Sequence, residues 1–239
     1  MFFRKMPDKK DLTPEQRQQK NHLSYILESY KSIRANIMFA MAGNKSDDAH
    51  IIMFSGAEQA VGKTTTCINV AQAFAEASAN VLVIDADLRR PSVERYITEK
   101  KEKQGLSEFI GGFCELDDVI VRPEDCGFDC IFSGRTPPNP SELLMLDKVQ
   151  DMLKTLSERY DYIFIDVPPV NIVSETLYLT QFVDGVLLVA KTYSTHYNKL
   201  QSAIAGLKFA NANFLGFVLN GALNRQKRKY YKRGRYYYY

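Results

Sequence analysis

The fold of this 239-residue chain is decided by residues 51–66, which read IIMFSGAEQAVGKTTT. The apolar run at 51–55 predicts a strand buried on both faces, and a helix should follow the glycine-lysine pair. Between them, residues 57–64 have the spacing of a phosphate-binding loop, with Ala57 in place of the usual first glycine. The backbone N–H groups of such a loop and of the helix after it form an anion site. The segment therefore predicts a nucleotide phosphate site.

Each residue of this loop has an expected task. Lys63 would reach the β- and γ-phosphates of ATP, and the Thr64 hydroxyl would hold Mg²⁺. Because Ala60 and Val61 carry side chains, we expect neither to adopt a positive φ. Asn220, which ends a later apolar run, matches an adenine-contacting position of related phosphate-loop proteins, although a strand-ending turn explains it equally well. The loop residues expected to contact the nucleotide are Glu58, Gln59, Ala60, Val61, Gly62, Lys63, Thr64 and Thr65.

Two further apolar runs end in acidic residues. Asp85 and Asp87 follow one of these runs, and Asp166 follows the other. In an open α/β sheet, ligands bind at the carboxyl ends of the strands. Carboxylates at that edge, with two arginines shortly after Asp87, suit the chemistry of Mg²⁺ and phosphate. The alternative is that these acidic residues lie in ordinary solvated turns at the strand ends. The phosphate loop predicted nearby makes this alternative less favoured.

The alternation of apolar and helical segments predicts the fold class. Apolar runs typical of buried strands lie at 51–55, 81–84, 162–165, 186–190 and 214–219. Helical patterns lie at 63–78, 141–158, 174–182 and 196–210, and a short helix is expected at 106–110. This order predicts an α/β fold, in which a mainly parallel twisted sheet is flanked by helices as in P-loop NTPases.

The chain divides into three expected parts. Residues 1–20 are polar and predicted to be disordered, residues 21–224 form the P-loop domain with an N-terminal helix, and residues 225–239 form a flexible tail. Thr13 and Pro14 are a helix-start signal, so a helix to about residue 41 is compatible with the pattern, with or without a break near position 21.

The tail is basic and rich in tyrosine. Residues 225–239 carry a charge of +7, which leaves −4 on the remaining 224 residues of a chain with net charge +3. A mildly acidic body argues against a nucleic-acid-binding protein. Tyrosines at a chain end find few partners to bury them, which indicates a substrate, a ligand or a swapped element. The six tail tyrosines are Tyr230, Tyr231, Tyr236, Tyr237, Tyr238 and Tyr239.

The cysteines and the apolar segments indicate a cytoplasmic protein. Cys67, Cys114, Cys126 and Cys130 fit no zinc-site spacing and are expected to be reduced thiols. The N-terminus lacks the apolar run of a signal peptide, and no segment approaches the roughly 20 apolar residues of a membrane span. Any attachment to a membrane would therefore come through a partner or the tail.

Together these motifs resemble the bacterial tyrosine kinases of the capsular and exopolysaccharide type, the BY-kinases. The strand ending in Asp-x-Asp-x-Arg at 85–89 is similar to that family's second Walker motif. Residues 133–144 (SGRTPPNPSELL), 183–189 (VDGVLLV) and 216–220 (GFVLN) also resemble family segments. The resemblance covers roughly residues 22–239, and the combination of motifs is specific.

The resemblance implies an ATP- and Mg²⁺-dependent kinase that phosphorylates protein tyrosines, including its own six tail tyrosines. It implies catalytic roles for Lys63, Asp85, Asp87 and Asp166, with Thr64, Asp85 and Asp166 as the metal residues. Asp87 would help to orient or deprotonate the attacking phenol. The family's phosphate loop usually has Pro-Gly where this chain has Gln59 and Ala60.

The resemblance also implies partners. A homo-oligomer, in the form of a ring, would use Glu28, Lys31 and Arg34, with Lys31 where the family usually has arginine. A transmembrane adaptor of the polysaccharide co-polymerase type would activate the kinase and recruit it from the cytoplasm to the inner face of the cell membrane. A phosphotyrosine phosphatase and other protein substrates complete the expected set.

Two other functions fit parts of the sequence. A partition or cell-division type ATPase switch would share the loop, but such proteins usually carry a lysine where this chain has Glu58, and the tail would have no role. A non-catalytic scaffold that binds anionic surfaces through its tail would not need Lys63 and the three aspartates. The detection of phosphotyrosine after incubation with ATP and Mg²⁺ separates these functions.

Overall fold

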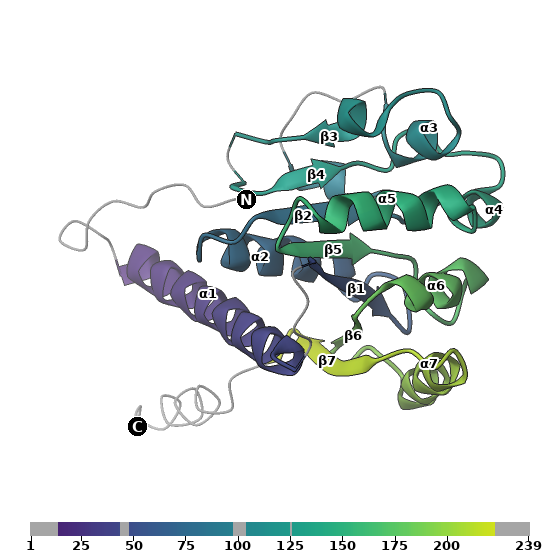
Figure 1. Ribbon diagram of the computed structural model, residues 1–239. Helices are drawn as coiled ribbons and strands as arrows, with labels where there is room; N and C mark the ends of the chain where they lie inside the picture. Colours follow the sequence, from purple (N-terminus) through teal and green to yellow (C-terminus); the bar gives the residue numbers. More distant parts are fainter. Residues whose placement is uncertain (1–13, 44–47, 98–103, 125, 223–239) are drawn as a thin grey trace, which may run out of the picture.

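A mainly parallel β-sheet forms the centre of the molecule (Figure 1). The computed structural model describes residues 14–43, 48–97, 104–124 and 126–222. Within them the strand order is β3-β4-β2-β5-β1-β6-β7, and each neighbouring pair is parallel except β3 with β4. The strands are β1 (His50–Gly56), β2 (Val81–Asp85), β3 (Ile120–Val121), β4 (Asp129–Ile131), β5 (Tyr162–Asp166), β6 (Gly185–Lys191) and β7 (Phe214–Asn220).

Helices cover both faces of the sheet (Figure 1). One hydrophobic cluster joins the sheet to α1 and α2, and a second joins it to α3, α5, α6 and α7. The α-helices are α1 (Pro14–Met41), α2 (Lys63–Ala75), α3 (Leu106–Ile110), α4 (Pro140–Leu144), α5 (Asp147–Ser157), α6 (Ser174–Leu179) and α7 (Tyr197–Phe209). The described residues also form the short 3₁₀ helices η2 (Val93–Arg95), η3 (Leu116–Val119) and η4 (Thr180–Phe182).

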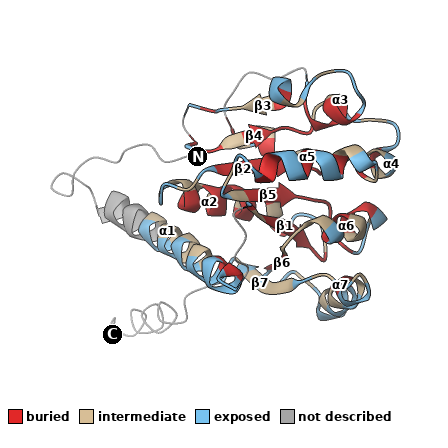
Figure 2. Cartoon of the chain, in the orientation of Figure 1, coloured by how far each residue is buried: buried red, intermediate tan, exposed pale blue. Residues whose placement is uncertain are grey.

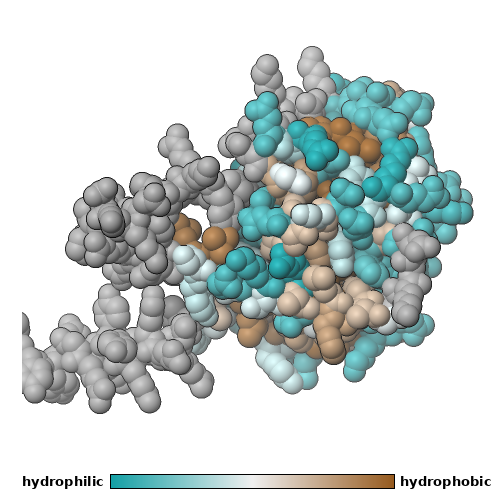
Figure 3. All heavy atoms as spheres, turned by 60° about the vertical axis from the view of Figure 1, so that its left-hand side comes forward, coloured by the Kyte–Doolittle hydropathy of each residue, from teal (hydrophilic) through white to brown (hydrophobic). Residues whose placement is uncertain are grey.

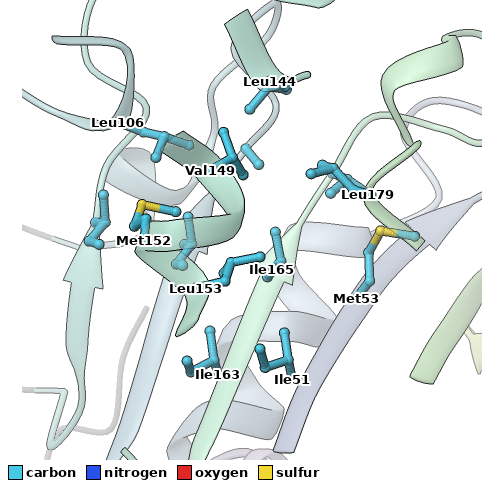
Figure 4. Close-up of a cluster of buried hydrophobic side chains, with 14 of the residues drawn as sticks. Ile51, Met53, Leu106, Leu144, Val149, Met152, Leu153, Ile163, Ile165 and Leu179 are labelled. Atoms are coloured by element: carbon cyan, nitrogen blue, oxygen red, sulfur yellow. The ribbon is translucent and has the colours of Figure 1, made fainter. Parts of the chain in front are cut away.

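The central strands are buried on both sides, as their apolar sequences predict (Figure 2). On β5, Ile163 and Ile165 face the cluster that contains Leu153 of α5 (Figure 4), whereas Phe164 belongs to the cluster on the other face. Burying each of these side chains stabilises the fold by roughly 1.5–3 kcal/mol. This packing on both faces of the sheet therefore fixes the positions of the carboxyl ends of β1, β2 and β5.

The predicted α/β fold and its five main strands are confirmed. The helix expected at 141–158 is instead two helices, because the chain turns at residues 145–146 and both Leu144 and Val149 become buried in one cluster. Strands β3 and β4 were not predicted, since segments of two and three residues are too short to show a pattern.

The N-terminal helix begins earlier than the predicted domain boundary. Helix α1 starts at Pro14 and continues without a break to Met41, so residues 14–20 are helical where disorder was expected. The helix-start signal at Thr13 and Pro14 outweighs the polar composition of this segment. Residues 1–13 lie outside the described part of the chain.

No described helix, α1 included, combines the length and the apolar character that crossing a bilayer requires. The exposed large hydrophobic side chains include Met38 and Phe39 of α1 and Phe217 and Leu219 of β7. On the face drawn in Figure 3, brown hydrophobic patches are separated by teal hydrophilic surface.

Candidate active site

The loop between β1 and α2 contains two residues with left-handed backbone. Ala60 has a φ of 58°, and Gly62 has a φ of 93°. The expectation that Ala60 avoids a positive φ is therefore wrong, whereas Val61 is not among the residues with a positive φ. A left-handed conformation costs roughly 1–2 kcal/mol for a residue with a Cβ atom. Contacts around the loop, such as the burial of Val61, must offset this cost.

Asn220, at the end of β7, lies directly against the loop. Its Nδ2 donates a hydrogen bond to the Val61 carbonyl over 3.0 Å, and its own carbonyl accepts one from the Thr192 N–H. A Cβ atom on Gly62 would lie 2.1 Å from the same Nδ2. The structure thus brings Asn220 to the predicted nucleotide site, where the positive φ favours glycine at position 62 and any side chain there would displace the Asn220 amide.

The first residues of α2 meet the acidic strand ends. The Lys63 Nζ lies 3.7 Å from Asp87 Oδ2 and 3.7 Å from Asp166 Oδ1, and all three side chains are at most 11% exposed. The Thr64 hydroxyl donates a short hydrogen bond to Asp166 Oδ2, and it lies 2.7 Å from the Ser92 hydroxyl. Residues predicted from three separate motifs therefore form one acidic centre with a lysine in it.

Asp85 lies behind this centre and organises the loop after β2. Its Oδ2 accepts hydrogen bonds from the N–H groups of Ser92 and Val93, and its Oδ1 accepts one from the N–H of Asp87. Burial raises the pKa of Asp85 to about 7, and the nearby Asp166 carboxylate adds to the rise, while the backbone hydrogen bonds oppose it. The backbone N–H groups therefore hold the Asp85 carboxylate in place against the repulsion of its acidic neighbours.

Asp166 has the properties of a cation ligand. Burial raises its pKa, and the positive charge of Lys63 opposes that rise. Its Oδ1 is fully buried and has no hydrogen-bond partner within the described residues. Those residues contain no group of three metal-ligating side chains, so Mg²⁺ would take Asp166 and Thr64 together with phosphate oxygens and water, which is its usual ligand set. The residues present fit Mg²⁺ bound with a nucleotide.

The rim of the loop is held by two cationic side chains. The Arg90 guanidinium donates to Gln59 Oε1, and the Lys199 Nζ lies 2.8 Å from Glu58 Oε1. The hydrogen bond from Lys199 lowers the pKa of Glu58. A hollow of about 490 Å³ lies beside these residues and is lined by Ala57, Glu58, Gln59, Asn171, Ile172, Asn198, Lys199 and Ser202.

Thr65, on the first turn of α2, donates a hydrogen bond to the Tyr96 hydroxyl.

The residues predicted to form an oligomer interface lie on α1 and not in the acidic centre. Glu28 and Lys31 form an exposed ion pair of 2.8 Å, and the Arg34 guanidinium donates to the Ala73 carbonyl of α2. Arg34 therefore anchors α1 to its own domain. The tail tyrosines predicted as phosphoacceptors lie outside the described residues.

Three residues near the site were missed by the sequence analysis. Ser92 contacts Thr64 and could have been suspected, since it follows the second acidic motif closely. Lys199 and Glu175 belong to no motif, and their partners lie far away along the chain. Only the folded structure brings them to the site.

Comparison with known proteins identifies relatives across most of the chain. A family model described as "AAA domain" matches residues 49–208. Tyrosine-protein kinase etk of Escherichia coli (strain K12) is 34% identical over 210 residues, which make up 88% of this chain and 28% of etk. Tyrosine-protein kinase CpsD of Streptococcus pneumoniae is 33% identical over 193 residues, which make up 81% of this chain and 83% of CpsD. The chain thus spans little more than a quarter of etk but most of CpsD.

Solved structures give the same picture. The kinase domain of Escherichia coli ETK superposes with a TM-score of 0.78 at 35% identity, and the match covers 83% of this chain and 76% of that one. The cell division ATPase MinD of Pyrococcus furiosus, with a TM-score of 0.62, 23% identity and coverage of 74% and 75%, shares the fold. The phosphate loop, the acidic strand ends and these relatives agree, and the chain belongs to the family of bacterial tyrosine-protein kinases.

Proposed function

We propose that this chain is an ATP-dependent protein-tyrosine kinase that phosphorylates itself and regulates the synthesis and export of a capsular or extracellular polysaccharide. The observation that carries the proposal is the position of Lys63, whose Nζ lies 3.7 Å from both Asp87 Oδ2 and Asp166 Oδ1 at the phosphate loop. The names of the relatives, tyrosine-protein kinases, suggest the reaction. A further relative, from Klebsiella pneumoniae, is named a putative tyrosine-protein kinase in cps region.

The loop residues would hold the ATP phosphates. The N–H groups of residues 58–65 and the Lys63 ammonium would contact the phosphates, and Asn220 would lie near the base. Thr64 and Asp166 would hold Mg²⁺, and Asp85, in register with Asp166, would orient its water ligands. Mg²⁺, when bound with ATP, supplies positive charge that offsets the negative charge on the transferred phosphoryl group.

Asp87 is proposed to accept the proton of the attacking tyrosine. A phenol has a pKa near 10, so an aspartate at the reacting oxygen assists its attack at neutral pH. Asp87 Oδ1 is occupied by the N–H of Arg90, which leaves Oδ2, on the side of Lys63, to take the proton. The carboxylate is therefore oriented for this role by its own loop.

The proposed partners follow the family. We propose a homo-oligomer, in which Glu28, Lys31 and Arg34 contribute to the contact, and phosphorylation of Tyr230, Tyr231 and Tyr236–Tyr239 between subunits. A transmembrane adaptor would recruit the cytoplasmic kinase to the inner face of the membrane and stimulate it. One related structure is a chimerical protein named CapA2B2, which suggests such a pairing. A phosphotyrosine phosphatase would remove the phosphate groups by hydrolysis, and other proteins would serve as substrates.

The test is mass spectrometry of the purified chain after incubation with ATP and Mg²⁺. Phosphotyrosine should appear in the wild type and be lost in a folded Lys63→Met variant, because a buried cation at the transferred phosphoryl group is worth several kcal/mol to the transition state. Release of phosphate from ATP without phosphotyrosine would instead favour an ATPase switch. Equal phosphorylation of the Lys63→Met variant would contradict the assigned site.

A further inference from the structure

A buried carboxylate outside the acidic centre joins three segments of the chain. Glu175 lies in the first turn of α6, and its side chain is 1% exposed. Its Oε1 accepts a hydrogen bond from Arg89 Nε over 3.1 Å, and its Oε2 accepts one from the Ser141 hydroxyl over 2.9 Å. Arg89 Nη2 also donates to the Ser141 hydroxyl over 2.7 Å. The three side chains form a closed triangle between the loop after β2, helix α4 and helix α6.

Burial makes this triangle more than a surface ion pair. A carboxylate removed from water is stable only when charged or hydrogen-bonding partners replace the lost water. Both oxygens of Glu175 have such partners, whereas the Arg89 side chain is 45% exposed and retains contact with solvent. Breaking these contacts would therefore carry a larger free-energy cost for the buried Glu175 carboxylate than for the solvated Arg89 guanidinium. The buried acid fixes the position of the arginine.

The loop that carries Arg89 also carries Asp87. The N–H of Arg90 donates to Asp87 Oδ1 over 3.1 Å, and the Arg90 guanidinium donates to Gln59 of the phosphate loop. Two consecutive arginines thus attach the loop to two different elements, Arg89 to α6 and Arg90 to the phosphate loop. Asp87 lies two residues before this pair of anchors.

Helix α6 is in turn attached to the strand end that carries Asp166. The hydroxyl of Thr176, the residue after Glu175, donates to the Pro168 carbonyl over 3.1 Å. Pro168 lies two residues after Asp166. The first turn of α6 therefore connects the loop that bears Asp87 with the segment that directly follows Asp166 at the end of β5.

We infer that Glu175 is a positioning residue for phosphoryl transfer, which acts through Arg89 to hold Asp87 in place beside Lys63. The inference rests on the proposed kinase function. Glu175 itself contacts Arg89 and Ser141, so its loss should misplace the proton acceptor without removing any contact to ATP. A displacement of about 1 Å at a reacting group lowers a rate by roughly 100-fold. The expected effect is on kcat, and KM for ATP should stay unchanged.

The experiment compares the full chain with its Glu175→Gln and Arg89→Lys variants. The substrates are ATP with Mg²⁺ and a synthetic peptide of residues 225–239. We expect kcat to fall by roughly 10- to 100-fold in both variants at unchanged KM for ATP. In a background of Asp87→Asn, Glu175→Gln should cause no further fall, because its effect passes through Asp87. The matched control is Tyr160→Phe, which removes a hydrogen bond of 2.9 Å to Asp129 at the start of β4 and should leave kcat unchanged.

Four outcomes decide the question. An unchanged kcat in a folded Glu175→Gln variant, or a fall of equal size in the presence and absence of Asp87, would overturn the inference. A rise in KM for ATP with unchanged kcat would also overturn it, by assigning Glu175 to nucleotide binding. A wild type that forms no phosphotyrosine would refute the kinase function and this inference together. Should Glu175→Gln fail to fold, Arg89→Lys and Ser141→Ala interrupt the same triangle with smaller changes.

Discussion

Asp85 and Asp166 lie opposite each other in register on the adjacent parallel strands β2 and β5, with exposed fractions of 1% and 0%. Two carboxylates so close and so buried cannot both be charged without a compensating cation. Lys63 supplies part of that charge from the start of α2. The register of the two strands therefore places buried carboxylates where the lysine of the phosphate loop offsets part of their charge.

The first prediction concerns pH and stability in the absence of nucleotide and metal. Burial and the charge of Asp166 raise the pKa of Asp85 from 3.8 to about 7, so the folded chain binds this proton more tightly than the unfolded chain does. The free energy of unfolding should therefore fall as the pH rises from about 4 to about 7. The Asp85→Asn variant lacks this titration and should gain stability relative to the wild type between about pH 5 and about pH 8.

Urea unfolding at those two pH values measures the effect. The control is Asp151→Asn, which changes an exposed carboxylate on α5 and should follow the wild type at both values. A stability difference between Asp85→Asn and the wild type that does not change with pH would show that Asp85 does not titrate in this range.

The second prediction divides the carboxylates by role. Asp166→Asn and Asp85→Asn should weaken the Mg²⁺ dependence as well as the rate, because both residues belong to the proposed metal-binding group. Asp87→Asn should lower the rate and retain the binding of ATP with Mg²⁺. Calorimetric titration and initial rates measure the two effects. If Asp87→Asn alone lost binding, the roles would be reversed.

The third prediction tests the phosphate loop. Gly62→Ala places a Cβ atom 2.1 Å from Asn220 Nδ2 at a residue with a φ of 93°, so it should weaken nucleotide binding and destabilise the fold. The backbone strain alone costs roughly 1–2 kcal/mol. Adding Asn220→Ala removes the steric contact but not the strain, so the double variant should recover only part of the stability. Full recovery, measured by thermal unfolding, would show that the backbone conformation is not limiting.

The fourth prediction concerns transfer between subunits. A Lys63→Met chain with an intact tail is mixed with an active chain truncated at Gln226, and phosphate should appear on the tail of the inactive partner. Each phosphate adds roughly −1.5 to −2 charges, so four of them would cancel the +7 of the tail and the oligomer should become smaller. Light scattering follows its mass. No transfer in the mixture would rule out phosphorylation between subunits, and transfer at constant mass would rule out the switch.

The sequence predicted those parts of the site that depend on local order. Asp85, Asp87 and Asp166 could be placed because each follows an apolar strand, and parallel strands end at one edge of the sheet. The contacts of Glu175 with Arg89 and of Lys199 with Glu58 could not be predicted, since no spacing relates helices α6 and α7 to the loops they meet.

Backbone conformation set a second limit on prediction. The break at residues 145–146 has no glycine or proline to mark it, and tertiary packing decides it. We expected Ala60 to avoid a positive φ, because a Cβ atom disfavours that conformation, but its φ is 58°. Tertiary contacts override a backbone preference of this size when together they stabilise another conformation.

The left-handed backbone of Ala60 also changes the entropy of the loop. Glycine at this position would sample both signs of φ before a ligand binds, and that freedom would be lost on binding. Alanine samples fewer conformations, so a loop already held at a φ of 58° has less disorder to lose when phosphate arrives. The methyl group of Ala60 thus strains the backbone, and it also leaves the phosphate site better organised before a ligand binds.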